Sequence, residues 1–143
     1  MGKVTVVGSY IVAFVMDVDH TPLEGETLTG RNYHITHGGK GSNMAVAAAR
    51  LGGQTTFLGR IGRDACGEDF LRLLAKENVD AGGVLFSDKF PTAVGFILTC
   101  ANGTNSIVVD PAACVELCPA DLDEHRALID AADVVGSPGV NPL

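Results

Sequence analysis

The residue types best suited to binding a polar ligand lie in one glycine-rich segment, residues 37–52 (HGGKGSNMAVAAARLG). Glycines at positions 38, 39 and 41 remove Cβ atoms where a backbone must come close to a ligand. A helix expected to begin near Asn43 would turn its free N–H groups toward the same place. The pattern therefore predicts a ligand-binding loop at the start of a helix.

Two phosphate-binding loops have glycine patterns of this kind, and neither fits. The Walker loop needs Gly-Lys followed by Ser or Thr, whereas Gly41 follows Lys40. The dinucleotide fingerprint needs a third Gly or Ala where Met44 stands, and a buried strand where residues 32–36 are half polar. A dinucleotide-binding domain therefore remains the weakest of the functional alternatives.

The segment closely resembles the first sequence motif of the ribokinase-like (PfkB) carbohydrate kinases. The resemblance rests on residues at the family's spacing, which are Gly38, Gly39, Gly41, Asn43, Ala45, Gly52 and Gly62. It continues through residues 59–67 (GRIGRDACG) and extends over nearly the whole chain, including residues 8–9, 25–27 and 91–95. We therefore identify the chain as similar to the N-terminal part of such a kinase.

The resemblance implies an α/β fold, a Rossmann-like parallel-sheet sandwich with a small β-sheet lid whose segments are about residues 11–36 and 92–110. Residues 1–143 would then form the N-terminal part of the kinase domain, with the C-terminal part missing. Members of the family bind a sugar between domain and lid, and they often form dimers through their lids. The expected partners are therefore a sugar or nucleoside and a second copy of the chain.

The resemblance also assigns roles to individual residues. In the family, the second glycine of the motif, its lysine and its asparagine contact sugar hydroxyls, which assigns substrate binding to Gly39, Lys40 and Asn43. The chemistry agrees, because an ammonium and a carboxamide beside bare backbone can satisfy several hydroxyls at once. Arg63 and Asp64 are expected only to shape a loop.

Several positions depart from the family's pattern and bear on the substrate. Ribokinases carry an asparagine and an aspartate after the first strand to hold ribose hydroxyls, where this chain has Ile11 and Ala13. The family's Gly-Ala-Asn reads Ala112-Ala113-Cys114, and Gly139 closes the loop in which ribokinases place a pocket glutamate. Asp17 lies on the strand face of Ala13 but would reach the sugar only in a different register. We therefore expect a less polar sugar derivative or a nucleoside as readily as ribose.

The family's second motif, Gly-Ala-Gly-Asp, is absent from the 143 residues. In the family it lies at a helix N-terminus, where N–H groups hold the transferring phosphoryl group and the aspartate takes the hydroxyl proton. We therefore expect no catalytic residue here: the base would follow Leu143, MgATP would be the co-substrate of the complete enzyme, and this chain alone would hold no cofactor or metal and be inactive. The leading hypothesis is the substrate pocket and lid of an ATP-dependent carbohydrate kinase. The alternative is a non-catalytic sugar-binding or dimerisation module.

Strands that alternate with helices must position these groups. Short apolar runs predict buried strands at residues 4–8, 55–58, 84–86 and 134–136. Helices are expected at residues 43–51, 68–77 and 119–132, the last with Leu122, Leu128 and Ile129 buried. The half-polar residues 11–36, and the runs on either side of Asn102-Gly103, predict two antiparallel excursions. Together these elements indicate a parallel sheet covered on both faces, with a small β layer beside it.

The composition argues against several classes of protein. The formal charge of −7 comes from 17 acidic and 10 basic residues without a basic cluster, so we expect no nucleic-acid partner. Cys66, Cys100, Cys114 and Cys118 lack the paired spacing of a zinc site, and we expect them to be reduced, buried thiols of a cytoplasmic protein. No run approaches the ~20 apolar residues that span a bilayer, so no membrane partner is expected.

Overall fold

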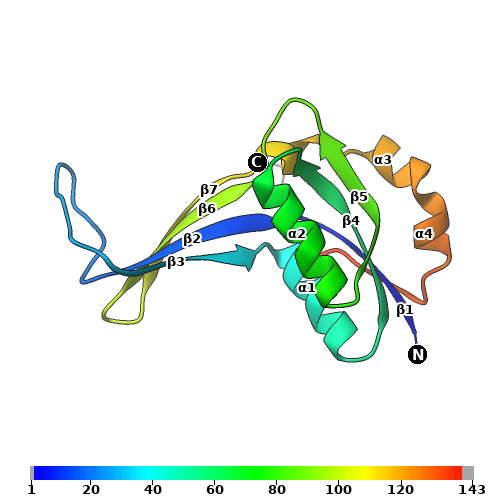
Figure 1. Cartoon of the computed structure of the whole chain (residues 1–143), viewed down its shortest axis with the longest axis horizontal. Coiled ribbons are helices and arrows are strands. Elements are labelled where there is room, and N and C mark those ends of the chain that lie inside the picture. Colours follow the sequence, from blue (N-terminus) through cyan, green and yellow to red (C-terminus); the bar gives the residue numbers. More distant parts are fainter. Residues whose placement is uncertain (1, 140–143) are drawn as a thin grey trace.

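The computed structural model describes residues 2–139 and contains two four-stranded sheets (Figure 1). The first sheet is parallel, in the order β5-β4-β1-β8. Its strands are β1 (Lys3–Val7), β4 (Gln54–Gly62), β5 (Asp80–Ser87) and β8 (Val134–Gly136). Because these strands alternate with helices along the chain, the predicted α/β fold with a parallel sheet is confirmed.

Helices cover both faces of the parallel sheet (Figure 1). They are α1 (Lys40–Arg50) and α2 (Ala65–Lys76) on one face, and α3 (Pro119–Glu124) and α4 (Arg126–Asp130) on the other. Val6 and Phe57 point toward the first pair and are fully buried with Phe70 of α2. Thr5, the neighbour of Val6, points the opposite way and donates its hydroxyl to the carbonyl oxygen of Leu128 at 2.8 Å. Alternate side chains of β1 therefore pack against helices on opposite faces of the sheet.

The second sheet joins the two predicted hairpins and is called the lid sheet below. Its strands, in the order β3-β2-β6-β7, are β2 (Ile11–Val18), β3 (Arg31–Gly38), β6 (Val94–Cys100) and β7 (Asn105–Asp110). Both hairpins are antiparallel, and a parallel pairing of β2 with β6 makes them one sheet. The lid sheet projects away from the helices (Figure 1), and the 3-10 helix η1 (Ala112–Glu116), which follows β7, packs against β4.

The single helix expected over residues 119–132 is wrong, because the chain forms two short helices that meet at His125. The ring Nδ1 of His125 lies 2.9 Å from the carbonyl oxygen of Asp121. The backbone N–H of His125 also donates to this oxygen, and the N–H of Leu128 donates to the carbonyl oxygen of His125, only three residues back, which interrupts the regular α-helical pattern. Leu122, Leu128 and Ile129, predicted to be buried, are only half-buried.

The last described strand is also less buried than predicted. Val134 and Val135 of β8 are 58% and 46% exposed. β8 pairs with β1 on one side, and within residues 2–139 no strand pairs with its other side. The strand therefore lies at an edge of the sheet rather than in its core.

Candidate functional site

A cavity of about 430 Å³ lies between the lid sheet and one end of the parallel sheet. Ser9, just after β1, and Lys40, at the start of α1, belong to its wall on the domain side. Cys114 of η1 closes the same side. The cavity therefore lies beyond the carboxyl end of a parallel strand, which is where open α/β sheets bind their ligands.

All three residues predicted to bind substrate line this cavity, which Gly39, Lys40 and Asn43 enter from the start of α1. The helix begins at Lys40, three residues before the expected start, so Lys40 and Asn43 lie one turn apart on the same side of the helix. Gly39 precedes the helix with φ of 100°, and a Cβ there would lie 2.6 Å from the carbonyl oxygen of Ser9. Glycine is thus required where the chain turns into the helix.

Close backbone contact holds the start of α1 against the turn after β1. A Cβ on Gly41 would lie 2.7 Å from the Cα of Gly8. The N–H of Ser42 donates to the carbonyl oxygen of Ser9 at 3.1 Å, and its hydroxyl donates to that of Gly38 at 2.6 Å. The N–H of Asn43 donates to the carbonyl oxygen of Gly39 at 3.0 Å, which is the first backbone hydrogen bond of the helix.

Alternate residues of three lid strands form the opposite wall. They are Ile11 and Ala13 of β2, Gly95 and Ile97 of β6, and Ile107 and Val109 of β7. Sequence reasoning identified the first two only as departures from the family and missed the other four, although their period of two in predicted strands was the available signal. Cys114 and Gly139 also line the cavity, so all four departures noted in the sequence lie around one space.

Two ionisable groups on the domain side of the cavity, Cys114 and Tyr10, have raised pKa values, which favour their neutral forms. Burial raises the pKa of the Cys114 thiol, whose Sγ lies 3.5 Å from the carbonyl oxygen of Tyr10. Burial, aided by negative groups nearby, also raises the pKa of Tyr10. The Tyr10 hydroxyl lies 2.9 Å from Nδ1 of His37, and its ring stacks on that of Phe70. These contacts hold Tyr10 against His37, the residue just before the glycines of the loop. His37 itself does not line the cavity.

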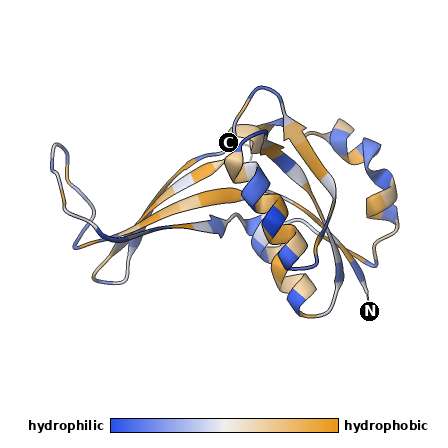
Figure 2. Ribbon diagram, in the orientation of Figure 1, coloured by the Kyte–Doolittle hydropathy of each residue, from blue (hydrophilic) through white to orange (hydrophobic). Residues whose placement is uncertain are grey.

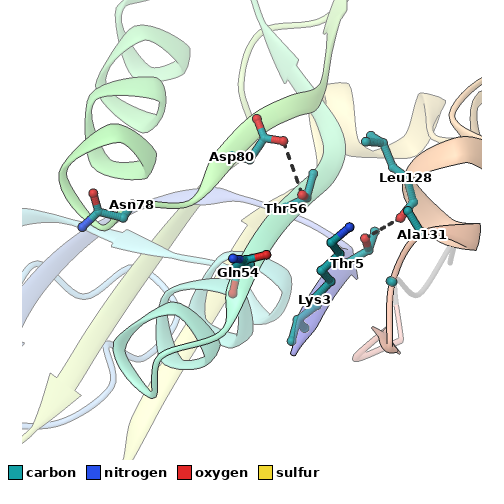
Figure 3. A pocket seen from close by; sticks show the side chains of 11 residues that line it. Lys3, Thr5, Gln54, Thr56, Asn78, Asp80, Leu128 and Ala131 are labelled. Atoms are coloured by element: carbon teal, nitrogen blue, oxygen red, sulfur yellow. Dashed lines mark hydrogen bonds between the residues drawn. The ribbon is translucent and has the colours of Figure 1, made fainter. Parts of the chain in front are cut away.

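A second cavity, of about 410 Å³, lies at the opposite end of the parallel sheet (Figure 3). Lys3, Gln54 and Asp80, which line it, are the first residues of β1, β4 and β5. It contains none of the predicted site residues, and it faces the amino ends of the strands, where ligands of open α/β sheets do not bind. The cavity beneath the lid sheet is therefore the candidate site.

Neither a metal cluster nor a membrane-spanning helix occurs in the part of the chain that the structure describes. Within residues 2–139, no three His, Cys, Asp or Glu side chains are grouped to hold a metal ion. Over the same residues, no helix is both long and apolar enough to cross a bilayer.

Comparison with known proteins places this geometry in a family. The model of the pfkB family of carbohydrate kinases matches residues 1–142. Ribokinase of Haemophilus influenzae is 37% identical over 129 residues, which cover 90% of this chain and 42% of the relative. Deoxyribokinase of Salmonella typhi is 34% identical over 125 residues, which cover 84% of this chain and 39% of the relative.

A solved structure agrees with the sequence matches. The ribokinase of Arabidopsis thaliana complexed with ribose and ATP superposes with a TM-score of 0.77 at 27% identity, covering 95% of this chain and 45% of that one. The chain spans about two fifths of the length of the curated relatives it matches. By the family match over nearly every residue, the chain belongs to the pfkB family of carbohydrate kinases.

Proposed function

We propose that this chain supplies the substrate pocket and lid of an ATP-dependent kinase that phosphorylates a hydroxyl of a sugar or sugar-like alcohol. One observation carries the proposal: Lys40 and Asn43 line a cavity whose opposite wall is the lid sheet. A sugar held there would meet hydrogen-bonding side chains on one side and a water-excluding sheet on the other. Relatives named ribokinase and deoxyribokinase support a sugar as the acceptor.

The residues of this chain bind and orient the acceptor. The Lys40 ammonium has three donors to offer hydroxyl oxygens, and the Asn43 carboxamide both donates and accepts. ATP supplies the phosphoryl group: the acceptor oxygen attacks the γ-phosphorus, ADP leaves, and the hydroxyl proton passes to a base. The 143 residues contain no Gly-Ala-Gly-Asp, so we assign the base and the MgATP site of the complete enzyme to sequence that follows Leu143.

Two preparations test the kinase proposal, this chain and a version extended beyond Leu143. Each is incubated with MgATP and a panel of pentoses, hexoses and nucleosides, and ADP release is measured. We expect turnover from the extended chain only. Absence of turnover from both, with folded protein, contradicts the kinase proposal.

Binding by this chain alone tests the site residues. By calorimetry, Lys40→Met and Asn43→Leu should each weaken binding of the preferred sugar roughly tenfold or more, because each removes a hydrogen-bonding group from the cavity wall. Lys76→Met is the matched control, since Lys76 is an exposed lysine at the end of α2. Equal affinities for Lys40→Met and the wild type would place the sugar elsewhere.

A non-catalytic sugar-binding module is the second candidate, because residues 9–139 already form the walls of the cavity. Such a module would show a rise in melting temperature with sugars and none with ATP, and its extended form would not release ADP. The assay of the two preparations therefore separates the candidates.

A second copy of the chain is the proposed partner at the lid. One cross-strand row on the lid face that points away from the cavity contains Ile35, Phe14, Phe96 and Val108. Ile35, Phe96 and Val108 are 57%, 56% and 71% exposed, and apolar residues dominate β2 and β6 (Figure 2). Contiguous exposed apolar surface of this kind marks an interaction site. Covering the row in a homodimer would remove these apolar side chains from water.

Sedimentation velocity tests the dimer. We expect the wild type to sediment as a dimer and Phe96→Glu as a monomer, since a charge on the row would have to be buried. Leu23→Glu is the control, because Leu23 is 72% exposed outside the lid strands. A monomeric wild type contradicts this part of the proposal.

The cytoplasm is the proposed location. Cys66, Cys100, Cys114 and Cys118 are all free thiols in the structure, but only Cys100 and Cys114 are buried, so the expectation of four buried thiols is wrong for the half-buried Cys66 and the exposed Cys118. Free thiols are typical of a reducing compartment.

A further inference from the structure

The lid wall of the cavity offers no hydrogen-bonding side chain. Register places Ala13 of β2 beside Gly95 of β6, and Gly95 beside Val109 of β7. In the next inward-facing row, Ile97 pairs with Ile107. The strands β2 and β6 pair on both sides, so their backbone N–H and C=O groups are engaged in the ladders of the lid sheet, whereas β7 lies at its edge. A ligand hydroxyl that points toward the face of this wall therefore meets side-chain hydrocarbon.

Polar side chains gather on the opposite wall. Ser9, Lys40 and Asn43 supply its hydrogen-bonding side chains, and the Cys114 thiol points at the carbonyl oxygen of Tyr10. Among the described residues that line the cavity, Lys40 carries the only charge and none carries a carboxylate. The polarity of the site is therefore one-sided.

The nearest candidate for a compensating carboxylate is engaged elsewhere. Asp17 on β2 would have to turn into the cavity to accept from a sugar hydroxyl. Its Oδ2 instead accepts from the Nδ2 of Asn32 at 2.8 Å, and it lines a separate hollow with Arg31 and Thr99. The alternative in which Asp17 replaces the missing acceptor is thus not realised in this register.

We propose that the substrate is a deoxypentose, held by hydroxyls on one side and presenting C–H bonds to the lid sheet. This inference rests on the proposed function and names its substrate class. A hydroxyl turned toward Ala13 or Val109 loses its water and gains no partner, whereas a C–H group loses nothing there. Overall identity does not choose between the sugars, because the ribokinase and deoxyribokinase relatives match at 37% and 34%. The one-sided polarity of the cavity favours the deoxypentose over ribose.

Calorimetry with matched sugars tests the proposal on this chain. We expect 2-deoxy-D-ribose to bind about 10- to 100-fold more tightly than D-ribose, the discrimination typical of a site that leaves one hydroxyl unpaired in an apolar wall. Equal binding, or tighter binding of D-ribose, overturns the substrate class but leaves the sugar-kinase proposal standing. Tighter binding of 2'-deoxyadenosine than of either sugar also overturns the substrate class and leaves the kinase proposal standing. Binding of none of them overturns both proposals.

A lid variant tests whether the wall is the cause. Val109→Thr keeps the shape of the side chain and adds one hydroxyl to the wall. It should therefore tighten D-ribose binding severalfold and reduce the preference for 2-deoxy-D-ribose over D-ribose. Val134→Thr is the matched control: it makes the same exchange on β8, outside the cavity, and should leave both affinities unchanged. A folded Val109→Thr protein with an unaltered ratio of affinities contradicts the proposal, and circular dichroism of both variants checks their folding.

Discussion

The carboxylate of Asp64 accepts two hydrogen bonds from Thr92, one from the backbone N–H and one from the hydroxyl, each at 2.7 Å. It also accepts from the N–H of Gly67 at 2.8 Å and so caps α2. The Thr92 hydroxyl in turn accepts from the N–H of Gly62 at the end of β4. Asp64 therefore ties the lid sheet to the parallel sheet, a larger role than the loop-shaping expected from its sequence.

Replacing this carboxylate by an amide should loosen the junction. In Asp64→Asn, an NH₂ group must face a donor of Thr92 or Gly67, which leaves a donor unsatisfied and should lower the free energy of unfolding by about 1–3 kcal/mol. Urea unfolding measures the change. Asp88→Asn is the control, because Asp88 pairs on the surface with Arg63 and should contribute less than about 1 kcal/mol. Equal losses in the two variants would contradict the role of Asp64.

Acid should destabilise the fold through Asp121. Arg60 donates to its two carboxylate oxygens at 2.6 and 3.0 Å, and these hydrogen bonds hold the pKa of Asp121 below its ordinary value despite burial. A lowered pKa stabilises the fold above the unfolded pKa of about 3.9, and this stabilisation is lost as the pH falls through the folded pKa. The free energy of unfolding should therefore fall below about pH 4.

The variant Asp121→Asn checks the source of that acid sensitivity. It should be less stable than the wild type at neutral pH, because Arg60 loses its charged partner, and its stability should fall less between about pH 5 and pH 3. Urea unfolding at several pH values gives both curves. Parallel curves would assign the acid sensitivity to other carboxylates.

Adding one methyl group at Gly41 should disturb the site. A Cβ there would lie 2.7 Å from the backbone of Gly8, so Gly41→Ala must push α1 away from the turn after β1. We expect a loss of about 1–3 kcal/mol in the free energy of unfolding and weaker sugar binding, since Lys40 moves with the helix. Gly82→Ala, whose added Cβ meets only the flexible side chain of Asp80, is the control and should leave binding unchanged.

The backbone at Ala112 holds a left-handed conformation, with φ of 39°. An L-residue is destabilised there by about 1–2 kcal/mol, and glycine is not. Ala112→Gly should therefore be at least about 1 kcal/mol more stable than Ala113→Gly, because both variants lose a buried methyl group and only the first relieves strain. Thermal unfolding of the two proteins decides it, and equal midpoints would contradict the strain.

Local patterns predicted much of this structure, and contacts between distant segments account for most of what they missed. The apolar run before Gly8 and the alanine-rich helix after Gly41 have strong local signals, and both elements form. Gly39, Lys40 and Asn43 reach one cavity because the motif fixes their spacing at a helix start. Their role as sugar ligands remains a prediction.

The failures have physical causes of a different kind. The break at His125 is a local change in backbone hydrogen bonding, in which Leu128 donates only three residues back, and hydrophobic periodicity does not register it. The β8 segment around Val134 is as apolar as a core strand, yet its burial depends on the elements packed beside it rather than on its own sequence. The lid wall around Ile97 requires the pairing of β2 with β6, for which no short-range signal exists.

That pairing also orders events during synthesis. Val12 lies beside Val94 in the finished sheet, so β2 and β3 leave the ribosome long before the hairpin that will complete them. Until β6 is made, the edge of β2 in the first hairpin has no strand partner. The glycine turn and α1, in contrast, form through contacts between residues close in sequence. The start of α1 can therefore form early, and the hydrocarbon side of the cavity is complete only once residue 110 has been made.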